Sequence, residues 1–262
     1  MLVKVPFTNT KGAWREGISN DTVKGPNAII KALKDIWMSE NYVLNVELIN
    51  LEKNIREISS KEKIFEEAKN FFQTVKERLI FIGGDHSISY NLVKAFSEIN
   101  EDGGILVFDA HLDCMVSHKV PNHEEWLRAL IERGLRPGRV THVGLRAPCL
   151  EEINFAKNRI SIFSCKDIFK GFKGAIEEII KKVKRFENLY VSIDIDVVDP
   201  AFAPGVAYPE PGGLTSREFL YIIQKIISLK NFKALDIVEV NPEKDLNGQT
   251  VKLASRIVVE SL

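Results

Sequence analysis

The stretch ILVFDAHLD, from Ile105 to Asp113, is a short run of large apolar residues that ends abruptly in acidic and histidine side chains. An apolar run without polar alternation is typical of a strand that is buried on both faces of a parallel sheet. LIFI (Leu79–Ile82) is followed in the same way by GGDHS, and LYVSIDID (Leu189–Asp196) ends in two aspartates. Because ligands of such sheets bind beyond the carboxyl ends of the strands, these polar groups are the candidates for function.

Similar apolar runs alternate with segments of helical period along the whole chain. This alternation predicts an α/β fold in which a parallel sheet is covered by helices on both faces. We expect strands at Leu2–Pro6, Tyr42–Leu48, Arg78–Ile82, Ile105–Asp109, Val140–Leu145, Arg159–Phe163, Leu189–Asp196 and Ala234–Val240. The expected helices include Lys61–Lys76, Ser87–Ser97, His123–Arg133, Lys173–Phe186 and Ser216–Leu229.

The composition excludes several classes of protein. The 262 residues are 45% hydrophobic, which is enough for a large core without disulfides. The 36 basic and 36 acidic residues cancel, which argues against a non-specific nucleic-acid binder and an anionic-lipid anchor. The sequence has no apolar run near the ~20 residues of a membrane helix, and its start is too polar for a signal peptide. Three widely spaced cysteines predict reduced thiols, so we expect a cytoplasmic protein.

The polar residues that follow the strands suggest one cluster. Asp109, His111 and Asp113 are spaced two apart, so in an extended chain their side chains would face one way. Asp194 and Asp196 repeat the spacing, and GGDHS adds His86. Surface polarity at a strand end would explain either motif alone, but two such motifs weaken that interpretation. Carboxylates that are crowded in a place of low dielectric repel one another unless cations hold them.

Four aspartates and two histidines would suit two divalent ions with a hydroxide between them. Oxygen and imidazole ligands without thiolates favour Mn²⁺ over a structural zinc site. Glu239, in DIVEVNP, also ends a predicted strand. Its carboxylate would suit a planar cation such as a guanidinium. It would equally suit a structural ion pair, and the residues leave both interpretations open.

Several longer motifs carry a resemblance to a known family. They are KGPNAI (Lys24–Ile29), GGDHS (Gly83–Ser87), DAHLD (Asp109–Asp113), SIDIDVVDPAFAPG (Ser192–Gly205), PEPGGL (Pro209–Leu214) and DIVEVNP (Asp236–Pro242). With these motifs in this order, the chain resembles the ureohydrolase family of arginases and agmatinases.

The resemblance implies a fold and a metal site. It implies a single domain over residues 1–262, a three-layer α/β/α sandwich with a mostly parallel eight-stranded sheet. It also implies two Mn²⁺ ions per chain and hydrolysis of a small guanidino substrate to urea and an amine, with no nucleic-acid or membrane partner. The ligands implied for one ion are His86, Asp109, Asp113 and Asp194. Those implied for the other are Asp109, His111, Asp194 and Asp196. A homo-oligomer, trimeric or hexameric, is expected from the same resemblance.

The resemblance also implies catalytic roles. Glu239 would bind the guanidinium group, and Asp113 would help to pass a proton to the leaving amine. The family places a histidine just before a helix, and His123 fits that position as a proton shuttle, although it would also suit an ordinary helix start. His118 is a weaker candidate for the shuttle, and His142, inside a strand pattern, is expected to be structural.

Departures from the family pattern concern the rest of the substrate. The loop from Cys114 to Asn122 lacks the Ser-Gly-Asn stretch with which arginases hold the α-carboxylate, and no Asp-Val-Asp follows Arg146. Tyr208 is bulkier than the threonine that the family usually has. These departures favour agmatinase over arginase, with Glu151 or Glu152 as a partner for the ammonium of agmatine. Lys119 keeps guanidinobutyrate open as a substrate. A non-catalytic descendant is disfavoured because all six metal ligands are present.

Overall fold

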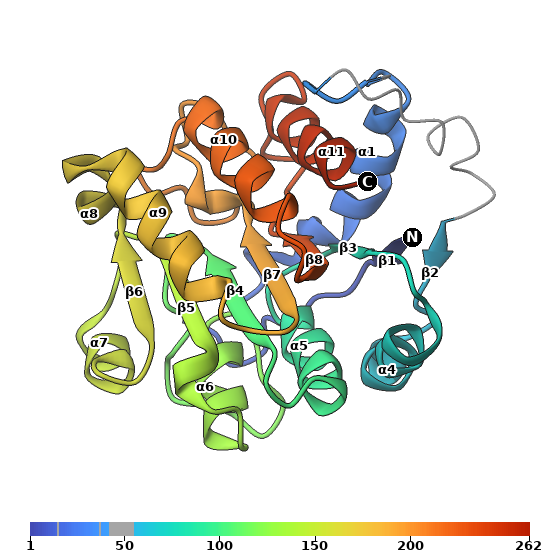
Figure 1. The fold of residues 1–262 in the computed structure, drawn as a ribbon. Coiled ribbons are helices and arrows are strands. Elements are labelled where there is room, and N and C mark those ends of the chain that lie inside the picture. Colours follow the sequence, from blue (N-terminus) through green and yellow to red (C-terminus); the bar gives the residue numbers. More distant parts are fainter. Residues whose placement is uncertain (15, 37, 42–54) are drawn as a thin grey trace.

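The computed structural model describes residues 1–14, 16–36, 38–41 and 55–262. Within these residues, eight strands form one sheet in the spatial order β2-β1-β3-β8-β7-β4-β5-β6, and every neighbouring pair is parallel (Figure 1). The strands are β1 Leu2–Val5, β2 Arg56–Glu57, β3 Leu79–Gly83, β4 Gly104–Phe108, β5 Val140–Leu145, β6 Ser161–Ser164, β7 Leu189–Asp194 and β8 Phe232–Val238. The predicted parallel eight-stranded α/β sheet is therefore confirmed.

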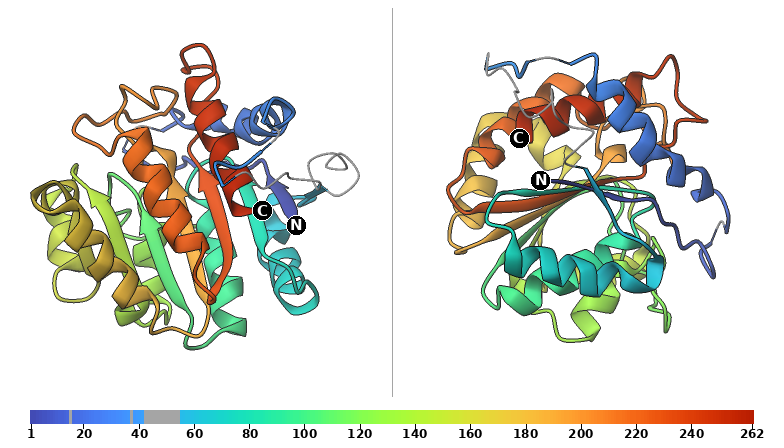
Figure 2. Two further views of the ribbon diagram at one scale, coloured as in Figure 1. Left: turned by 45° about the horizontal axis from the view of Figure 1, so that its top comes forward. Right: turned by 90° about the vertical axis from the view of Figure 1, so that its right-hand side faces the viewer.

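Helices cover both faces of the sheet and make a three-layer α/β/α arrangement (Figure 2). The core on one face includes side chains of α1 (Gly25–Leu33), α8 (Cys165–Lys170), α9 (Phe172–Val183), α10 (Ser216–Ile227) and α11 (Gln249–Ser261). The core on the other face includes side chains of α4 (Ile64–Thr74), α5 (Ile88–Ile99), α6 (Trp126–Glu132) and α7 (Leu150–Ala156).

Strand β4 shows why the central strands have no polar alternation. Its side chains alternate between the two layers: Leu106 and Phe108 belong to one core, and Ile105 and Val107 belong to the other. All four side chains are at most 1% exposed. Because successive residues of a strand point to opposite faces, a strand that is covered on both sides must be apolar at every position.

Helix α10 shows how the sequence positions a covering helix. The Thr215 hydroxyl accepts a hydrogen bond from the Glu218 backbone N–H, and the Glu218 carboxylate accepts one from the Thr215 N–H. This capping box fixes the first turn and satisfies amide groups that have no partner within the helix. The apolar side of the helix then packs on the sheet through Phe219, Ile222, Ile223 and Ile226.

The expected strands agree with the structure except at some of their ends. The expected strand Tyr42–Leu48 lies outside the described residues, and the two-residue strand β2 was not predicted. Strand β7 ends at Asp194 rather than Asp196, because residues Ile195–Val197 form a 3-10 turn. Strand β4 ends at Phe108, one residue earlier than expected. The helix that we expected at His123–Arg133 begins at Trp126.

The strand order explains where function can lie. Strands β3, β8, β7 and β4 are direct neighbours in the sheet. These same four strands are the ones that lead into GGDHS, Glu239, the Asp194–Asp196 pair and DAHLD. Because all four run in one direction, their carboxyl ends lie at a single edge of the sheet, which is where ligands bind in folds of this class.

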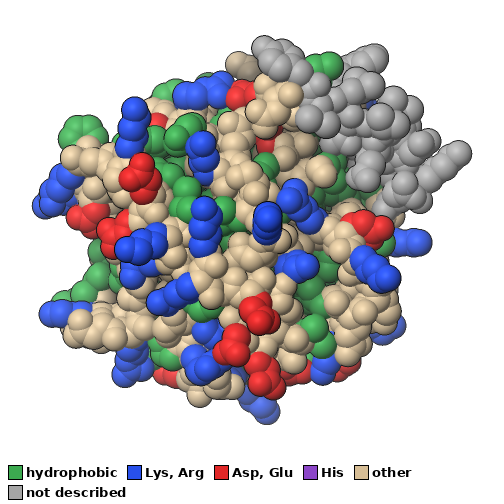
Figure 3. Space-filling model, viewed as in Figure 1, with side chains coloured by type: hydrophobic (Ala, Val, Ile, Leu, Met, Phe, Trp, Pro, Cys, Tyr) green, Lys and Arg blue, Asp and Glu red, His purple; other side chains and the backbone are tan. Residues whose placement is uncertain are grey.

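The surface agrees with the balanced charge of the sequence. Figure 3 shows one face of the molecule, on which Lys and Arg side chains are interspersed with Asp and Glu side chains. Among the helices that the structure describes, none is long and apolar enough to cross a membrane.

Candidate metal centre and substrate cavity

His86 is held in the turn between β3 and α5. Gly84 makes this turn possible, because a Cβ atom at that residue would lie 2.1 Å from the carbonyl oxygen of Phe7. The His86 ring is 1% exposed. Three carboxylate oxygens surround its Nδ1 atom: Asp113 Oδ2 at 2.9 Å, Asp109 Oδ2 at 3.0 Å and Asp194 Oδ2 at 3.5 Å.

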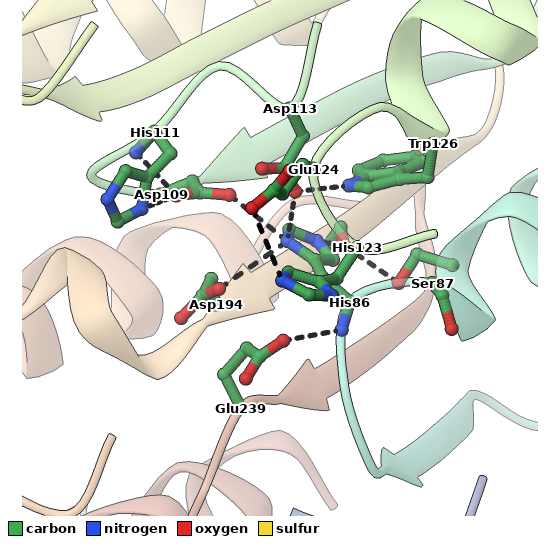
Figure 4. A network of polar contacts seen from close by, with 12 residues as sticks. His86, Ser87, Asp109, His111, Asp113, His123, Glu124, Trp126, Asp194 and Glu239 are labelled. Atoms are coloured by element: carbon green, nitrogen blue, oxygen red, sulfur yellow. Dashed lines mark hydrogen bonds and ion pairs between the residues drawn. The ribbon is translucent and has the colours of Figure 1, made fainter. Parts of the chain in front are cut away.

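His111 lies on the other side of Asp109. Its Nδ1 atom is 2.9 Å from Asp196 Oδ2 and 3.5 Å from Asp109 Oδ1. Asp109 therefore turns one oxygen toward each histidine, and Figure 4 shows its carboxylate between the two rings. The structure thus brings together the six side chains that the sequence motifs singled out as a cluster.

Five of these six side chains, all except Asp113, form two groups with the ligand types of a metal site. One group is His86, Asp109 and Asp194, and the other is Asp109, His111 and Asp196. In each group the candidate ligand atoms all lie within 4.8 Å of one another. The buried atoms His86 Nδ1 and Asp109 Oδ2 have no hydrogen-bond partner among the described residues, although they face each other. Two buried atoms that can ligate a metal, lie close together and have no hydrogen-bond partner are consistent with a site for a cation.

The contact between His86 Nε2 and Ser192 fits the same interpretation. Its Nε2 atom lies 3.0 Å from Ser192 Oγ, and the Ser192 hydroxyl donates to Asp236 Oδ1 at 2.8 Å. Because the serine proton goes to Asp236, Ser192 accepts from His86 Nε2–H. Burial opposes a charge on His86, but Asp109, Asp113 and Asp194 outweigh it and raise the pKa of the ring well above its ordinary value. With a cation in place of that proton, His86 protonated on Nε2 would direct the lone pair of Nδ1 at the cation, as a metal-ligating imidazole does.

Asp236 itself is a buried polar centre below the cluster. Its Oδ2 atom accepts hydrogen bonds from the Tyr190 hydroxyl at 2.7 Å and the Ser89 hydroxyl at 3.0 Å. The sequence did not mark Tyr190 and Ser192 as hydrogen-bond partners, because both lie inside the apolar run of a predicted strand. The signal that was available is a single aspartate inside the apolar run of β8, since such a residue requires several donors in a core.

Electrostatics oppose ionisation of the whole cluster. Burial, followed by the neighbouring Asp109 carboxylate, raises the pKa of Asp113 to about 7. Burial and the nearby Asp196 and Asp109 raise the pKa of Asp194 well above its ordinary value. Burial works against ionisation of Asp109 as well, but the rings of His111 and His86 outweigh it and lower its pKa. Divalent cations would allow all four carboxylates to be ionised together.

Our explanation of why the side chains of Asp109, His111 and Asp113 face one point was wrong. We expected an extended segment, but β4 ends before it and the backbone turns. The His111 N–H donates to Asp109 Oδ1 at 2.6 Å, and Asp113 has a φ of 50°, in the left-handed region. Trp126 Nε1–H donates to Asp113 Oδ2 at 2.7 Å and fixes this turn. The side chains converge because of the loop, not because of strand alternation.

A cavity of about 500 Å³ lies over the cluster. Beyond the cluster itself, its walls include Trp14, His123, Glu124, Tyr208, Glu210 and Glu239. Glu239 is 5% exposed and has a φ of 62°. Its Oε1 accepts the His86 N–H at 2.9 Å, whereas Oε2 has no hydrogen-bond partner within the described part of the chain. Burial, followed by Asp85, raises the pKa of Glu239 well above its ordinary value.

The three remaining histidines of interest differ in their surroundings. His123 is 5% exposed, and its ring stacks on Tyr208 with the centroids 5.7 Å apart. Neither of its ring nitrogens has a hydrogen-bond partner among the residues that the structure describes. His118 is not among the described residues that line the cavity, and it contacts Glu125 at 3.0 Å. His142 lies in β5 and donates from Nε2 to the His111 carbonyl at 2.6 Å, as expected of a structural residue.

Comparison with known proteins identifies relatives along the whole chain. The profile described as "Arginase family" matches residues 1–262. Agmatinase from Bacillus subtilis (strain 168) is 34% identical over 184 residues, which are 69% of this chain and 61% of that protein. Arginase 1, mitochondrial, from Arabidopsis thaliana is 34% identical over 203 residues, 75% of this chain and 58% of that protein.

A solved structure confirms the fold. The crystal structure of formimidoylglutamase from Bacillus subtilis subsp. subtilis str. 168 aligns with a TM-score of 0.85 and 23% identity. The alignment covers 99% of this chain and 84% of that chain. The two sequence alignments span about three fifths of the curated relatives, so the similarity does not decide between their different substrates.

The two ligand groups predict a stoichiometry of two divalent ions per chain. Calorimetric titration with Mn²⁺, checked by elemental analysis, should give two equivalents. Asp196→Asn should reduce the stoichiometry to one, because Asp196 belongs only to the group around His111. Asp109→Asn should weaken both sites, because Asp109 belongs to both groups. Two full equivalents in Asp196→Asn would show that the ligands have been assigned wrongly.

The contact between Ser192 and His86 predicts a second effect on metal binding. Ser192→Ala should weaken Mn²⁺ binding by roughly 10- to 100-fold, the usual effect of removing the group that orients a ligating histidine. Tyr190→Phe is the matched control, because it removes a donor to Asp236 but keeps the serine. It should lower the free energy of unfolding and change the Mn²⁺ dissociation constant much less. Equal losses of affinity in the two variants would contradict an orienting role for Ser192.

Proposed function

Because this chain belongs to the arginase family, we propose that it is a dinuclear manganese amidinohydrolase that converts agmatine and water to putrescine and urea. The carrying observation is the cavity over the candidate metal centre. Its described walls hold acidic and aromatic side chains and no lysine or arginine. Such a cavity suits a substrate with cations at both ends, a guanidinium at one and an ammonium at the other.

We propose His86, Asp109, Asp113 and Asp194 as ligands of one ion, and Asp109, His111, Asp194 and Asp196 as ligands of the other. Divalent ions in a site of this kind supply Lewis-acid polarisation and allow a water molecule to ionise at neutral pH. Carboxylates and imidazoles without thiolates favour Mn²⁺ for this role.

Glu239 is proposed to bind the guanidinium group. Its carboxylate lies in the cavity wall beside His86, and its free Oε2 atom can accept an N–H of a planar cation. Oε1 is held by the His86 backbone, so the carboxylate plane is fixed before the substrate arrives. A fixed carboxylate orients a guanidinium better than a flexible one, because less rotamer entropy is lost on binding.

Asp113 and His123 are proposed to move protons. Asp113 lies in the cavity wall, and Trp126 holds its Oδ2 atom in place. From this position Asp113 can take a proton from the attacking water and pass it to the amine that leaves. His123 lines the same cavity, and neither ring nitrogen has a hydrogen-bond partner within the described residues, so we propose that it relays protons between the cavity and solvent.

The groups that would hold a substrate carboxylate lie elsewhere. Lys119 lines a separate cavity with Lys61 and Arg133. The Ser117 hydroxyl donates to Glu132, and Asn122 is fully buried in contacts with its own loop and the N-terminal segment. A carboxylate in the substrate cavity would therefore face acidic side chains without a lysine or arginine partner in the described walls. This disfavours arginine and guanidinobutyrate relative to agmatine.

Glu239→Gln tests the guanidinium site. The glutamine keeps the acceptor for the His86 N–H but loses the charge. We expect kcat/KM for agmatine to fall by an amount equivalent to roughly 2–5 kcal/mol, as for one partner of a buried charge pair. Manganese content should not change. Glu151→Gln is the control, because Glu151 pairs with Arg128 and is not among the described residues that line the cavity. Near-normal turnover in Glu239→Gln would remove Glu239 from the site.

Substrate choice tests the proposed function as a whole. Urea release by the Mn²⁺-loaded protein should be measured against agmatine, arginine and guanidinobutyrate. We expect kcat/KM for agmatine to exceed that for arginine by at least about tenfold, or 1.4 kcal/mol in transition-state binding. Equal or faster hydrolysis of arginine would contradict the proposal. Turnover of guanidinobutyrate alone would also contradict the proposal, because Lys119 lines a separate cavity.

A further inference from the structure

Two carboxylates, Glu124 and Glu210, line the cavity, and each lies near a histidine that contacts the Tyr208 ring. The Tyr208 ring stacks on His123 and meets His111 edge-on, with the centroids 5.7 Å and 6.3 Å apart. Glu124 Oε1 lies 3.9 Å from His123 Nε2, and Glu210 Oε1 lies 4.0 Å from His111 Nε2. Each histidine therefore has its own acidic neighbour. A substrate that extends from the candidate metal centre along this cavity would pass close to Glu124 or Glu210.

The neighbour of His123 is joined to an exposed tryptophan. Trp14 lines the cavity, yet 84% of its surface is exposed. Its backbone N–H donates to Glu124 Oε2 at 2.8 Å, so one carboxylate oxygen holds the tryptophan in place. The other oxygen is the one that lies near His123. Trp14 and Glu124 therefore bring to one cavity two groups that attract an organic ammonium ion, a π face and a negative charge.

We propose that Trp14 and Glu124 form a subsite for the distal ammonium group of the guanidino substrate. This inference rests on the proposed function and assigns the substrate tail to one side of the cavity. The guanidinium lies against Glu239 at the metal centre, and the carbon chain passes Tyr208 toward the rim. The ammonium then pairs with Glu124 and lies against the indole of Trp14.

The other acidic groups near the cavity are less suited to this role. We expected Glu151 or Glu152, but both oxygens of Glu152 accept backbone N–H groups, from Cys114 at 3.0 Å and Cys149 at 3.2 Å. Glu151 pairs with Arg128. The Glu210 side chain is 40% exposed, against 22% for Glu124, so solvent screens it more strongly. None of these carboxylates holds an aromatic residue in the manner of Glu124 and Trp14.

A comparison of two substrates isolates the ammonium. Agmatine and 1-butylguanidine share the guanidinium and the four-carbon chain, and only agmatine carries the distal ammonium. We expect Glu124→Gln to lower the ratio of kcat/KM between agmatine and 1-butylguanidine by about tenfold, mainly through KM. Trp14→Leu, which keeps an apolar side chain, should lower it by roughly two- to fivefold. Turnover of 1-butylguanidine should change little in either variant, which shows that His123 and the metal centre are intact.

Glu210→Gln is the matched control, because it removes the same charge from the same cavity on the His111 side. It should leave the ratio nearly unchanged. Calorimetric dissociation constants for agmatine and 1-butylguanidine, measured on the same variants without added metal, should show the same ranking. An unchanged ratio in Glu124→Gln, or a collapse of the ratio only in Glu210→Gln, would overturn the subsite and leave the proposed function standing. If the Mn²⁺-loaded protein hydrolyses neither compound, both the function and the subsite fall.

Discussion

Mutual repulsion among buried carboxylates is the constraint on which the rest of this structure depends. Asp109, Asp113, Asp194 and Asp196 lie beside two imidazoles at the edge of an apolar sheet, where burial raises the pKa values of Asp113 and Asp194. Cations would relieve this repulsion, and His86 Nδ1 and Asp109 Oδ2, which have no hydrogen-bond partner among the described residues, lie where a cation would bind. The polar centre at Asp236 then explains why His86 turns its Nδ1 atom toward the cluster. The acidic charge of the candidate metal centre therefore connects the carboxylates with the orientation of the His86 ring.

The sheet supplies the rigid frame for that arrangement. Four neighbouring strands, β3, β8, β7 and β4, end at one edge, and each contributes a different functional segment. The strands are apolar on both faces, so their positions are fixed by two hydrophobic layers, and the loops beyond them can hold strained backbone. Asp113 and Glu239, both non-glycine residues with positive φ, occur in these segments. Strain of this kind persists only where the surrounding structure holds it, and it is concentrated here at the residues proposed for proton transfer and guanidinium binding.

Much of this arrangement could be predicted from the sequence, because apolar runs and strand-end polar motifs are local signals. The runs ILVF and LIFI indicated strands covered on both faces, and DAHLD, GGDHS and the Asp194–Asp196 pair indicated the cluster. Other features depend on contacts between distant segments. The turn at Asp113 is fixed by Trp126, and the roles of Ser192 and Asp236 arise only when β7 and β8 lie side by side. The placement of Trp14 at the cavity depends on Glu124, 110 residues away, and neither residue carries a motif. The hydrogen bond from the Cys114 N–H to Glu152, 38 residues away, likewise follows from the fold and not from a local pattern.

The central claim is that Asp109 stands between two divalent ions that His86 and His111 bind on either side. Anomalous diffraction at the manganese edge, from crystals grown with Mn²⁺, tests this claim most directly. We expect two peaks that flank the Asp109 carboxylate, one near His86 Nδ1 and the other near His111 Nδ1, about 3.5–4 Å apart as in two-metal hydrolytic sites. A single peak, or peaks remote from these two histidines, would contradict it.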